Sequence, residues 1–548
     1  PESQLSNILS PDGPKGYRND NFTQRATWLW TNMLTYEKTF NSVHAVKAVV
    51  GMEAQASKYR RINAMVEGFA TGKLDAISIG STNKDVLGTT TEWKMLSYLG
   101  SAGYTYDDKY ILDVALRRDG SSRFAPGHRW GTFPSFSAGW VASEEKFMKN
   151  LKWDWLSFLK LRGSWGMLGN ERIGSNYFPY IALMSFGNSL FYMADGSVVS
   201  DKTARPAVLA VEDITWETTT STDLGLDVNF LNNRLQFHFD YYWKETKDML
   251  LNIEIPYFMG YNNPSTNAGK MSTHGYDIEV AWNDQIGDFK YGVNVNFSDF
   301  LSKIDYMNDG EQISGGKIKR AGVLFNEFYG YVCEGIYQTQ EEVNNSARTS
   351  TTVTVGDLKY RDISGPDGVP DGVISPEYDR VPLGNSLPRF QYGGSLNASY
   401  KGIDFSLAFQ GIGKQNSYLS TSMVQPLRDN YGNVPAILEG KYWSPFNTTE
   451  ENLAAKYPRL SNVSKSNNYA TSNFWMFNGS YFRLKNITLG YTLPKSWTQK
   501  AGINRARFYV SGSDLFCLSN FPSGWDPEMG TSDYPITTSL VMGIQVNF

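Results

Sequence analysis

Segments of about ten residues in which every second side chain is apolar recur along the chain. In segment 234–244, the apolar Leu235 and Phe237 alternate with the polar Gln236 and His238. FKYGVNVNFS and the C-terminal ITTSLVMGIQVNF show the same alternation. Successive side chains of a β-strand point to opposite faces, so this period of two predicts strands with one apolar and one polar face.

The composition also favours strands and turns over helices. Of the 548 residues, 14% are aromatic, 19% are charged and 50 are glycine, which together favour an all-β fold. The chain has no run of about 18 apolar residues, as a membrane-spanning helix would require. A membrane barrel needs an apolar residue only at every second position. No Pro-rich, Ser-rich or charged linker divides the sequence, so one large architecture is expected.

Several functional classes are disfavoured. The net charge is -4 and the Lys and Arg residues are scattered, so a basic surface for nucleic acid is not expected. Cys333 and Cys517 lack the spacing of a zinc site or a disulfide framework. The four histidines belong to no HExxH motif, and no GxSxG motif is present. We therefore assign no catalytic residue and do not expect an enzyme.

Tight turns alternate with long connections. Aromatic residues flank five short connections and occupy the apolar positions of the alternating pattern. The connections are FNSVHA, YTYDDKY, FLNNRL, NDQIGDF and YKGIDF. The aromatic residues are Phe40, Tyr110, Phe230, Trp282, Phe289 and Tyr400. Outer-membrane barrels have short periplasmic turns, long extracellular loops and aromatic girdles at the membrane interfaces. The sequence therefore predicts a membrane-spanning antiparallel β-barrel.

The alternating segments give about fifteen candidate strands. They lie near residues 25–40, 44–59, 89–104, 110–118, 134–143, 155–165, 216–230, 234–244, 274–283, 289–303, 390–400, 403–413, 481–493, 505–516 and 536–548. Bacterial single-chain barrels have an even number of strands. We therefore expect residues 25–548 to be the C-terminal portion of a larger barrel. Residues 1–24 are expected to be an extracellular loop at a truncated or cleaved start, with the remaining strands on a separate or cleaved chain.

Several extended stretches carry a family resemblance. The segment YILDVALRRDGSSRFAPGHRWGTFPSFSAGWVASEEKFMKN, followed by LKLRGSWGMLGNERIGSNYFPY, closely resembles the SusC/RagA family of TonB-linked outer-membrane proteins of Bacteroidetes. WETTTSTDLGLDVNFLNNRLQFHFDYYWKETKDML, GYNNPSTNAGKMSTHGYDIEVAW and FRLKNITLGYTLP agree in order. The resemblance covers most of the chain.

The resemblance implies a TonB-dependent transporter. Proteins of this family have a 22-strand barrel and an N-terminal plug inside it, so the plug and about seven strands are expected outside this chain. A SusD-like lipoprotein would cap the extracellular mouth, and TonB, ExbB and ExbD would supply the energy. The implied activity is import of a large nutrient, an oligosaccharide or a peptide, across the outer membrane.

Loop residues are the candidates for binding a substrate. Asn170 and Arg172 follow the end of an expected strand, where their side chains would face the mouth and hydrogen-bond a ligand. Ordinary loop solubility explains them equally well. Aromatic loop residues would stack on sugar rings or peptide side chains, and packing within the loops is the alternative. These aromatic residues are Tyr177, Phe178, Tyr180, Tyr261 and Trp475.

Carboxylates gather around glycines in DISGPDGVPDGVI. Asp362, Ser364, Asp367 and Asp371, with the following Asp379, offer the oxygen ligands that Ca²⁺ prefers. The segment resembles a family loop that reads closer to D-x-N-G-D-G-x-I. A serine in place of the asparagine, a proline and an extra GVPD unit depart from that form. A turn held by aspartate side chains bonded to backbone amides is the alternative interpretation.

Polar residues of the expected strands would face the lumen and would contact a plug or line a path. They include Arg162, Asp227, His238, Asp240, Asn294 and Asn397. Two alternatives to transport stay open. One is a structural or adhesive outer-membrane barrel without active transport. The other is a soluble carbohydrate-active sandwich or propeller, which would need a catalytic carboxylate pair on separate strands.

Overall fold

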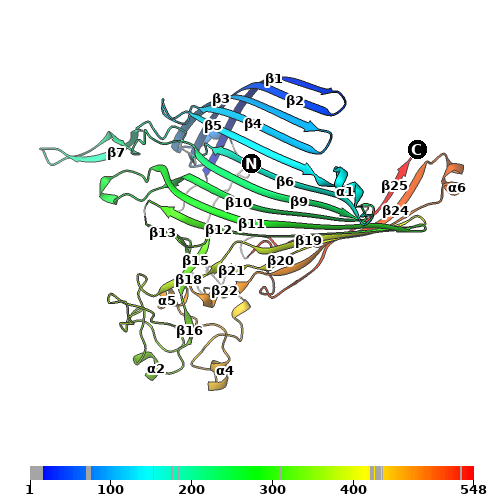
Figure 1. Ribbon diagram of the computed structural model, residues 1–548. Helices are drawn as coiled ribbons and strands as arrows, with labels where there is room; N and C mark the ends of the chain where they lie inside the picture. Colours follow the sequence, from blue (N-terminus) through cyan, green and yellow to red (C-terminus); the bar gives the residue numbers. More distant parts are fainter. Residues whose placement is uncertain are drawn as a thin grey trace. The chain divides into compact units, whose positions relative to one another are not determined.

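The regular structure of the chain is mainly β-strand in the computed structural model (Figure 1). The structure describes residues 17–69, 76–151, 153–173, 177–182, 184–308, 310–419, 425, 434, 436–530 and 534–548. Helices in these ranges have at most five residues, and none is long and apolar enough to cross a membrane. The prediction of an all-β fold is confirmed.

Fifteen strands form one large sheet whose order follows the chain. They are β1 (Tyr17–Phe40), β2 (His44–Glu67), β3 (Thr82–Tyr106), β4 (Tyr110–Ser121), β5 (Trp130–Val141), β6 (Leu156–Asn170), β9 (Glu217–Phe230), β10 (Leu235–Asn252), β11 (Ser265–Ile286), β12 (Phe289–Met307), β19 (Arg389–Tyr400), β20 (Ile403–Lys414), β23 (Tyr481–Thr492), β24 (Arg505–Ser519) and β25 (Ser539–Asn547). The predicted number of strands is confirmed for the described residues. Strand β1 begins before the expected Arg25, so residues 17–24 extend this strand, and residues 1–16 lie outside the described part.

Tight turns join the strands at one end of the sheet. Strands β1 and β2 pair antiparallel along their whole length, from Tyr17 opposite Glu67 to Phe40 opposite His44. The turn between them has φ values of 51° and 62° at Asn41 and Ser42. Two consecutive residues of positive φ suit a short hairpin, because their twist matches that of the strands.

Aromatic side chains cluster next to these turns, as the girdle prediction requires. Tyr106 and Tyr110 stack across the β3–β4 turn with their ring centroids 6.3 Å apart. Trp155 and Phe230 stack with centroids 5.8 Å apart, and Phe289 contacts Tyr400 at 6.5 Å. Rings with a polar edge and an apolar body favour the boundary between membrane and water.

Two compact units make up the chain. Unit 1 comprises residues 1–138, 164–221 and 246–269, and unit 2 comprises residues 139–163, 222–245 and 270–548. Unit 1 has a small buried core formed by Phe124, Phe133, Ile173, Ile214 and Trp216. The indole Nε1 of Trp216 donates to the backbone oxygen of Arg129 at 3.0 Å, so its polar atom is satisfied inside this core.

Unit 2 contains a second kind of structure in the long connections β12–β19 and β20–β23. We call the described residues within 308–388 and 415–480 the loop assembly. Its core consists of Tyr331, Leu358, Tyr360, Ile374, Leu419 and Trp475. The buried Asp357 accepts hydrogen bonds from Arg459 Nε at 2.7 Å, Ser464 Oγ at 2.8 Å and Asn468 Nδ2 at 2.9 Å. A buried carboxylate is tolerated only with such partners.

The remaining elements lie in the connections between the strands of the large sheet. The strands are β7 (Met184–Tyr192), β8 (Val198–Pro206), β13 (Glu311–Ser314), β14 (Lys317–Arg320), β15 (Glu327–Tyr331), β16 (Cys333–Ile336), β17 (Leu358–Tyr360), β18 (Arg380–Asn385), β21 (Asn416–Tyr418) and β22 (Met476–Asn478). The helices are α1 (Lys146–Asn150), α2 (Gln340–Asn344), α4 (Thr449–Leu453), α5 (Lys465–Asn468) and α6 (Lys495–Thr498). Single 3₁₀ turns are η1 (Ile77–Ile79), η2 (Ala142–Glu144), η3 (Tyr257–Met259), η4 (Ala436–Leu438), η5 (Asn473–Trp475) and η6 (Gln499–Ala501).

Candidate functional site

Charged side chains meet on the polar face of the strands of unit 2. The guanidinium of Arg162 on β6 lies 2.6 Å from Asp240, 3.2 Å from Asp227 and 3.5 Å from Asp223. His238 Nδ1 lies 2.9 Å from Asp227 Oδ1. We call these five residues the charged sector. The structure thus brings together four of the residues that were expected to face the lumen, and it adds Asp223.

Strand periodicity and one glycine explain the charged sector. Asp223, Gly225 and Asp227 alternate along β9 and therefore share a face. A Cβ atom at Gly225 would lie 2.4 Å from the guanidinium carbon of Arg162, so a larger residue there would displace the guanidinium from this position. Asp277 on β11 interacts electrostatically with Asp240. Asp277 also interacts with Lys244, so four carboxylates face two cations, Arg162 and Lys244, and this part of the face has an acidic surplus.

One row of residues across the next five strands is uncharged. The strand registers place Gly292 beside Asn397, Asn397 beside Ser406, Ser406 beside Thr488, and Thr488 beside Ser511. The hydroxyls of Thr488 and Ser511 lie 2.8 Å apart. We call these five residues, from Gly292 to Ser511, the neutral row. Its amide and hydroxyl groups offer donors and acceptors, which suit sugar hydroxyls and peptide groups alike.

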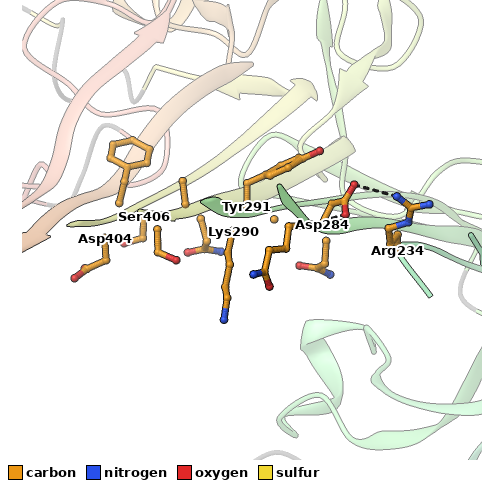
Figure 2. Close-up of a pocket in the computed structure, with 13 residues that line it drawn as sticks. Arg234, Asp284, Lys290, Tyr291, Asp404 and Ser406 are labelled. Carbon is orange, nitrogen blue, oxygen red and sulfur yellow. Dashed lines mark hydrogen bonds and ion pairs between the residues drawn. The ribbon is translucent and has the colours of Figure 1, made fainter. Parts of the chain in front are cut away.

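A hollow of about 690 Å³ lies at the short-turn end of this region (Figure 2). Arg234 pairs with Asp284 at 3.3 Å, and Asp404 is held by Arg507. The side chain of Lys290 points away from the sheet, on the side opposite the Tyr291 ring (Figure 2). Lys290 is exposed and forms no ion pair within the described part of the chain. The lining residues are Arg234, Asn283, Asp284, Gln285, Lys290, Tyr291, Gly292, Asn397, Ala398, Ser399, Asp404, Phe405 and Ser406.

The predicted ligand residues of the motif GNERIGSNYFPY are partly used by the protein itself. The amide nitrogen of Asn170 donates to Glu217 Oε1 at 3.1 Å, and its Oδ1 accepts the backbone N–H of Arg172 at 3.1 Å. The side chain of Arg172 is exposed. Of these two candidates, Arg172 is therefore the one whose side chain is available to a ligand.

The tyrosines of the same motif help to hold its connection in place. The buried Arg123 lies 3.4 Å from Glu171, and its guanidinium sits 4.5 Å from the centre of the Tyr177 ring. The hydroxyl of Tyr180 donates to the backbone oxygen of Ser122 at 3.5 Å. A cation stacked on an aromatic face is stabilising, and more so when it is buried. Tyr177 and Tyr180 remain half-exposed, so their ligand role stays a prediction.

Two of the other three aromatic candidates, Tyr261 and Trp475, differ in burial. Tyr261 is half-buried near η3, and its ligand role also stays a prediction. Trp475 is 1% exposed, donates to the backbone oxygen of Asn468 at 2.9 Å, and packs against Phe474 with centroids 4.8 Å apart. A ring covered in this way has no face left for a sugar or a peptide. Packing within the loop assembly therefore describes Trp475, which corrects its assignment as a ligand residue.

The aspartates expected to bind calcium bond to backbone amides. Asp379 is buried and accepts the N–H groups of Ile363 at 2.7 Å, Ser364 at 3.2 Å and Ser375 at 2.7 Å. Further along, Asp362 accepts from Gly372, and Asp371 accepts from Val373. Asp367 is exposed. Across the described residues, no three His, Cys, Asp or Glu side chains are placed to hold a metal ion. Calcium binding stays a prediction.

The comparisons with known proteins agree with this architecture. The RagAB peptide transporter has a similar fold, with a TM-score of 0.79 and 23% sequence identity over 97% of this chain and 56% of that chain. Its structure in the closed-closed state gives a TM-score of 0.78 at 23% identity, over 97% of this chain and 57% of that one. These matches show that the chain shares its fold with the corresponding part of that protein.

The sequence matches the family described as "TonB dependent receptor-like, beta-barrel" over residues 3–511. The chain belongs to this family. It is 29% identical to TonB-dependent receptor P3 of Formosa agariphila over 99% of this chain and 54% of the relative. It is also 29% identical to TonB-dependent receptor SusC of Bacteroides thetaiotaomicron, over 83% of this chain and 44% of SusC. The protein is a SusC/RagA-type receptor barrel of the outer membrane, and the chain spans about half the length of these relatives.

Several residues of the polar face were not identified from the sequence. Lys290, Asp223 and the Asp404–Arg507 pair were not singled out, although each has the parity of the polar face in its strand. Their positions in the alternating pattern of each strand predict that they face the lumen. The pattern could not have paired Asp404 with Arg507, because these residues are about a hundred positions apart and meet only through the register of three strands.

Proposed function

We propose that this chain forms the C-terminal part of the wall of an importer for a large nutrient. In this proposal, the barrel portion begins with strand β1 at Tyr17 and continues to the C-terminal strand β25. A plug and further strands outside this chain complete the receptor. A SusD-like lipoprotein would capture an oligosaccharide or a peptide at the mouth, and TonB with ExbB and ExbD would supply the energy.

The observation that carries the proposal is the two-faced wall of unit 2. The neutral row, from Gly292 to Ser511, crosses five strands without a charged side chain. The opposite face of the same strands exposes apolar residues such as Leu489, which is 56% exposed, and Val510, which is 42% exposed. A wall that is polar on one side and apolar on the other separates a water-filled path from lipid.

The chemistry of the wall favours a neutral, hydrogen-bonding cargo. Uncharged amides and hydroxyls bind sugar hydroxyls or peptide groups weakly and reversibly, which lets a cargo leave as well as enter. A related protein is described as a peptide transporter, and the neutral row suits such a cargo as well as a glycan. The charged sector would repel strongly acidic cargo, because its carboxylates outnumber Arg162.

Uptake by cells that produce the whole receptor and its lipoprotein partner tests the proposal. Ser406→Trp would narrow the path from the polar face, and Leu407→Trp adds the same bulk to the apolar face of the same strand. We expect the first variant to lower uptake of a fluorescent oligosaccharide or peptide at least tenfold. The second should leave it nearly unchanged, since its side chain faces lipid. Removing TonB should abolish uptake in every receptor.

Two controls make the result decisive. The heat-dependent mobility of the receptor on SDS gels shows whether each variant still forms a barrel. Uptake that persists without TonB would contradict the proposal. Equal uptake by the two tryptophan variants would contradict it as well. Surface binding of cargo without any uptake would instead favour a structural or adhesive barrel.

A further inference from the structure

An apolar groove of about 810 Å³ lies on the strands β20 and β23–β25 of unit 2. Seven of its lining residues alternate with the positions of the neutral row and therefore lie on the membrane face: Ile403, Leu489, Tyr491, Phe508, Val510, Met542 and Ile544. Met542 is 72% exposed and Ile544 is 63% exposed. The lining residues are Ile403, Leu489, Gly490, Tyr491, Phe508, Tyr509, Val510, Met542, Gly543 and Ile544. A hollow of this kind on a membrane face accepts hydrocarbon.

The connection next to this groove carries only positive charge. Between Leu484 and Asp514 the sequence contains no Asp or Glu. The connection from β23 to β24 includes α6, where Lys495 is exposed and Trp497 is 64% exposed. A basic segment with an exposed tryptophan is typical of a membrane interface.

A second lysine, Lys401, lies in the neighbouring turn between β19 and β20. The Nζ of Lys401 lies 5.3 Å from the centre of the Tyr400 ring, on the apolar parity of β19. The backbone N–H of Thr492 donates to the oxygen of Gly402 at 2.7 Å, which ties this turn to the connection that carries α6. Lys401 is two residues from Ile403 of the groove, a span of about 7 Å along a strand. The lysines therefore flank the groove at its short-turn end.

The equivalent connection between β5 and β6 is charged differently. It contains α1, and there Lys149 pairs with Glu144 at 2.6 Å. Glu145 and Asp154 add further negative charge in the same connection. Near Lys401 and Lys495, the nearest carboxylate in sequence is Asp404, which is held by Arg507 on the polar face. Within the described part of the chain neither Lys401 nor Lys495 forms an ion pair, whereas Lys149 of α1 does.

We propose that the groove and the two lysines form a binding site for an anionic glycerophospholipid. One acyl chain occupies the groove between Leu489 and Ile544, and the phosphate contacts Lys401 and Lys495. Trp497 lies at the level of the glycerol backbone. Short turns of outer-membrane barrels face the periplasm, so the lipid comes from the inner leaflet. The site lies on the outside of the wall and is independent of the transport path.

Native mass spectrometry of the whole purified receptor tests the site. The receptor is equilibrated with mixed micelles that contain equal amounts of phosphatidylglycerol and phosphatidylcholine with identical acyl chains. We expect it to retain phosphatidylglycerol preferentially. The variant Lys401→Gln/Lys495→Gln should lower this retention on the order of thirtyfold, because each lysine near an anionic headgroup contributes about fivefold. Its retention of phosphatidylcholine should fall much less, because the choline ammonium already offsets the charge of that lipid's phosphate.

Two further variants complete the test. Lys146→Gln/Lys149→Gln removes two lysines from the α1 connection and should leave the retention of both lipids unchanged. Leu489→Trp fills the groove and should lower the retention of both. Equal retention of the two lipids by the unmodified receptor would overturn the proposal, as would normal retention in Lys401→Gln/Lys495→Gln. Normal retention in Leu489→Trp would overturn the placement of the acyl chain. Heat-dependent gel mobility confirms that each variant is folded.

Discussion

The strands of unit 2 and the loop assembly of the same unit differ in whether their large apolar side chains are exposed or buried. In the strands, large apolar side chains lie on the surface, as with Leu540 at 65% and Met542 at 72% exposure. In the loop assembly, Leu419 and Trp475 are 0% and 1% exposed. Such an exposed apolar surface is stable only when something other than water covers it.

The difference reflects the surroundings of each region, which are the membrane for the strands and water for the loop assembly. The strands use the membrane to cover their apolar face, and their backbone hydrogen bonds are satisfied within the sheet. The loop assembly has to fold in water, so it has a packed core in which the buried carboxylate of Asp357 is hydrogen-bonded by three side chains. Changes to that core should damage the loop assembly and leave the strands in place.

The largest effect is expected from Asp357→Ala. Arg459 loses its ion-pair partner, and Ser464 and Asn468 lose their acceptor inside the core. Breaking a buried pair in this way costs about 3–5 kcal/mol. Hydrogen exchange should increase throughout the loop assembly, with unchanged gel mobility of the barrel. Glu334→Ala, which breaks the exposed pair with Arg361, is the control. Unfolding of the barrel together with the loop assembly would contradict the conclusion that the two regions are stabilised separately.

A smaller, more local effect is expected from Asp379→Ala. Three backbone N–H groups lose their acceptor, which we expect to cost about 2–3 kcal/mol after partial rehydration. Limited proteolysis should cut the segment 362–379 faster than in the unmodified protein, and Asp367→Ala should not change the rate. Calcium that protects this segment in the unmodified protein and in neither variant would support the predicted metal site.

In the strands, Arg162→Met should have a more modest effect. The charged sector is partly hydrated, since the side chain of Arg162 is 32% exposed, so water screens the carboxylates that remain. We expect a loss of about 1–2 kcal/mol in the stability of the barrel, measured by urea titration in detergent micelles. Arg234→Met removes a single exposed pair and should cost less. A loss as large as that of Asp357→Ala would contradict the contrast between the two regions.

The smallest effect concerns the thiol of Cys333 in the loop assembly. Burial disfavours the thiolate and raises the pKa of Cys333 to about 11. The resulting stabilisation is complete below the ordinary cysteine pKa and is lost as the pH rises toward 11. At pH 8 only about one thiol in a thousand is ionised, so iodoacetamide should react slowly. The rate should still rise between pH 9 and 10.5, where that of an ordinary thiol levels off.

Much of the fold follows from the sequence because strand periodicity is local. The alternation near Leu235 and Phe237 needs no knowledge of distant residues, and fifteen strands were predicted and found. The strand ends were less predictable. Strand β2 continues to Glu67, well beyond the expected end at residue 59, because its pairing with β1 extends past the alternating segment. Pairing partners determine such ends, and the local pattern does not contain them.

The polar face was predictable in part for the same reason. Parity alone selected Arg162, Asp227, His238 and Asp240, which the structure brings together. It did not reveal that Gly225 makes room for the arginine, since that depends on the register between β6 and β9. The loop residues were harder still. An aromatic residue in a loop can bind a ligand or fill a core, and only the fold shows that Trp475 does the latter.

Cysteine labelling along β20 tests most directly whether this wall separates a water path from lipid. Single cysteines replace Ser406 on the polar face and Phe405 and Leu407 on the apolar face of the whole receptor, whose native cysteines are replaced by serine. A charged, water-soluble thiosulfonate should modify Ser406→Cys readily and the other two at least tenfold more slowly. A spin label in the lipid acyl chains should show the reverse order of contact. Equal modification of the three positions would contradict the account.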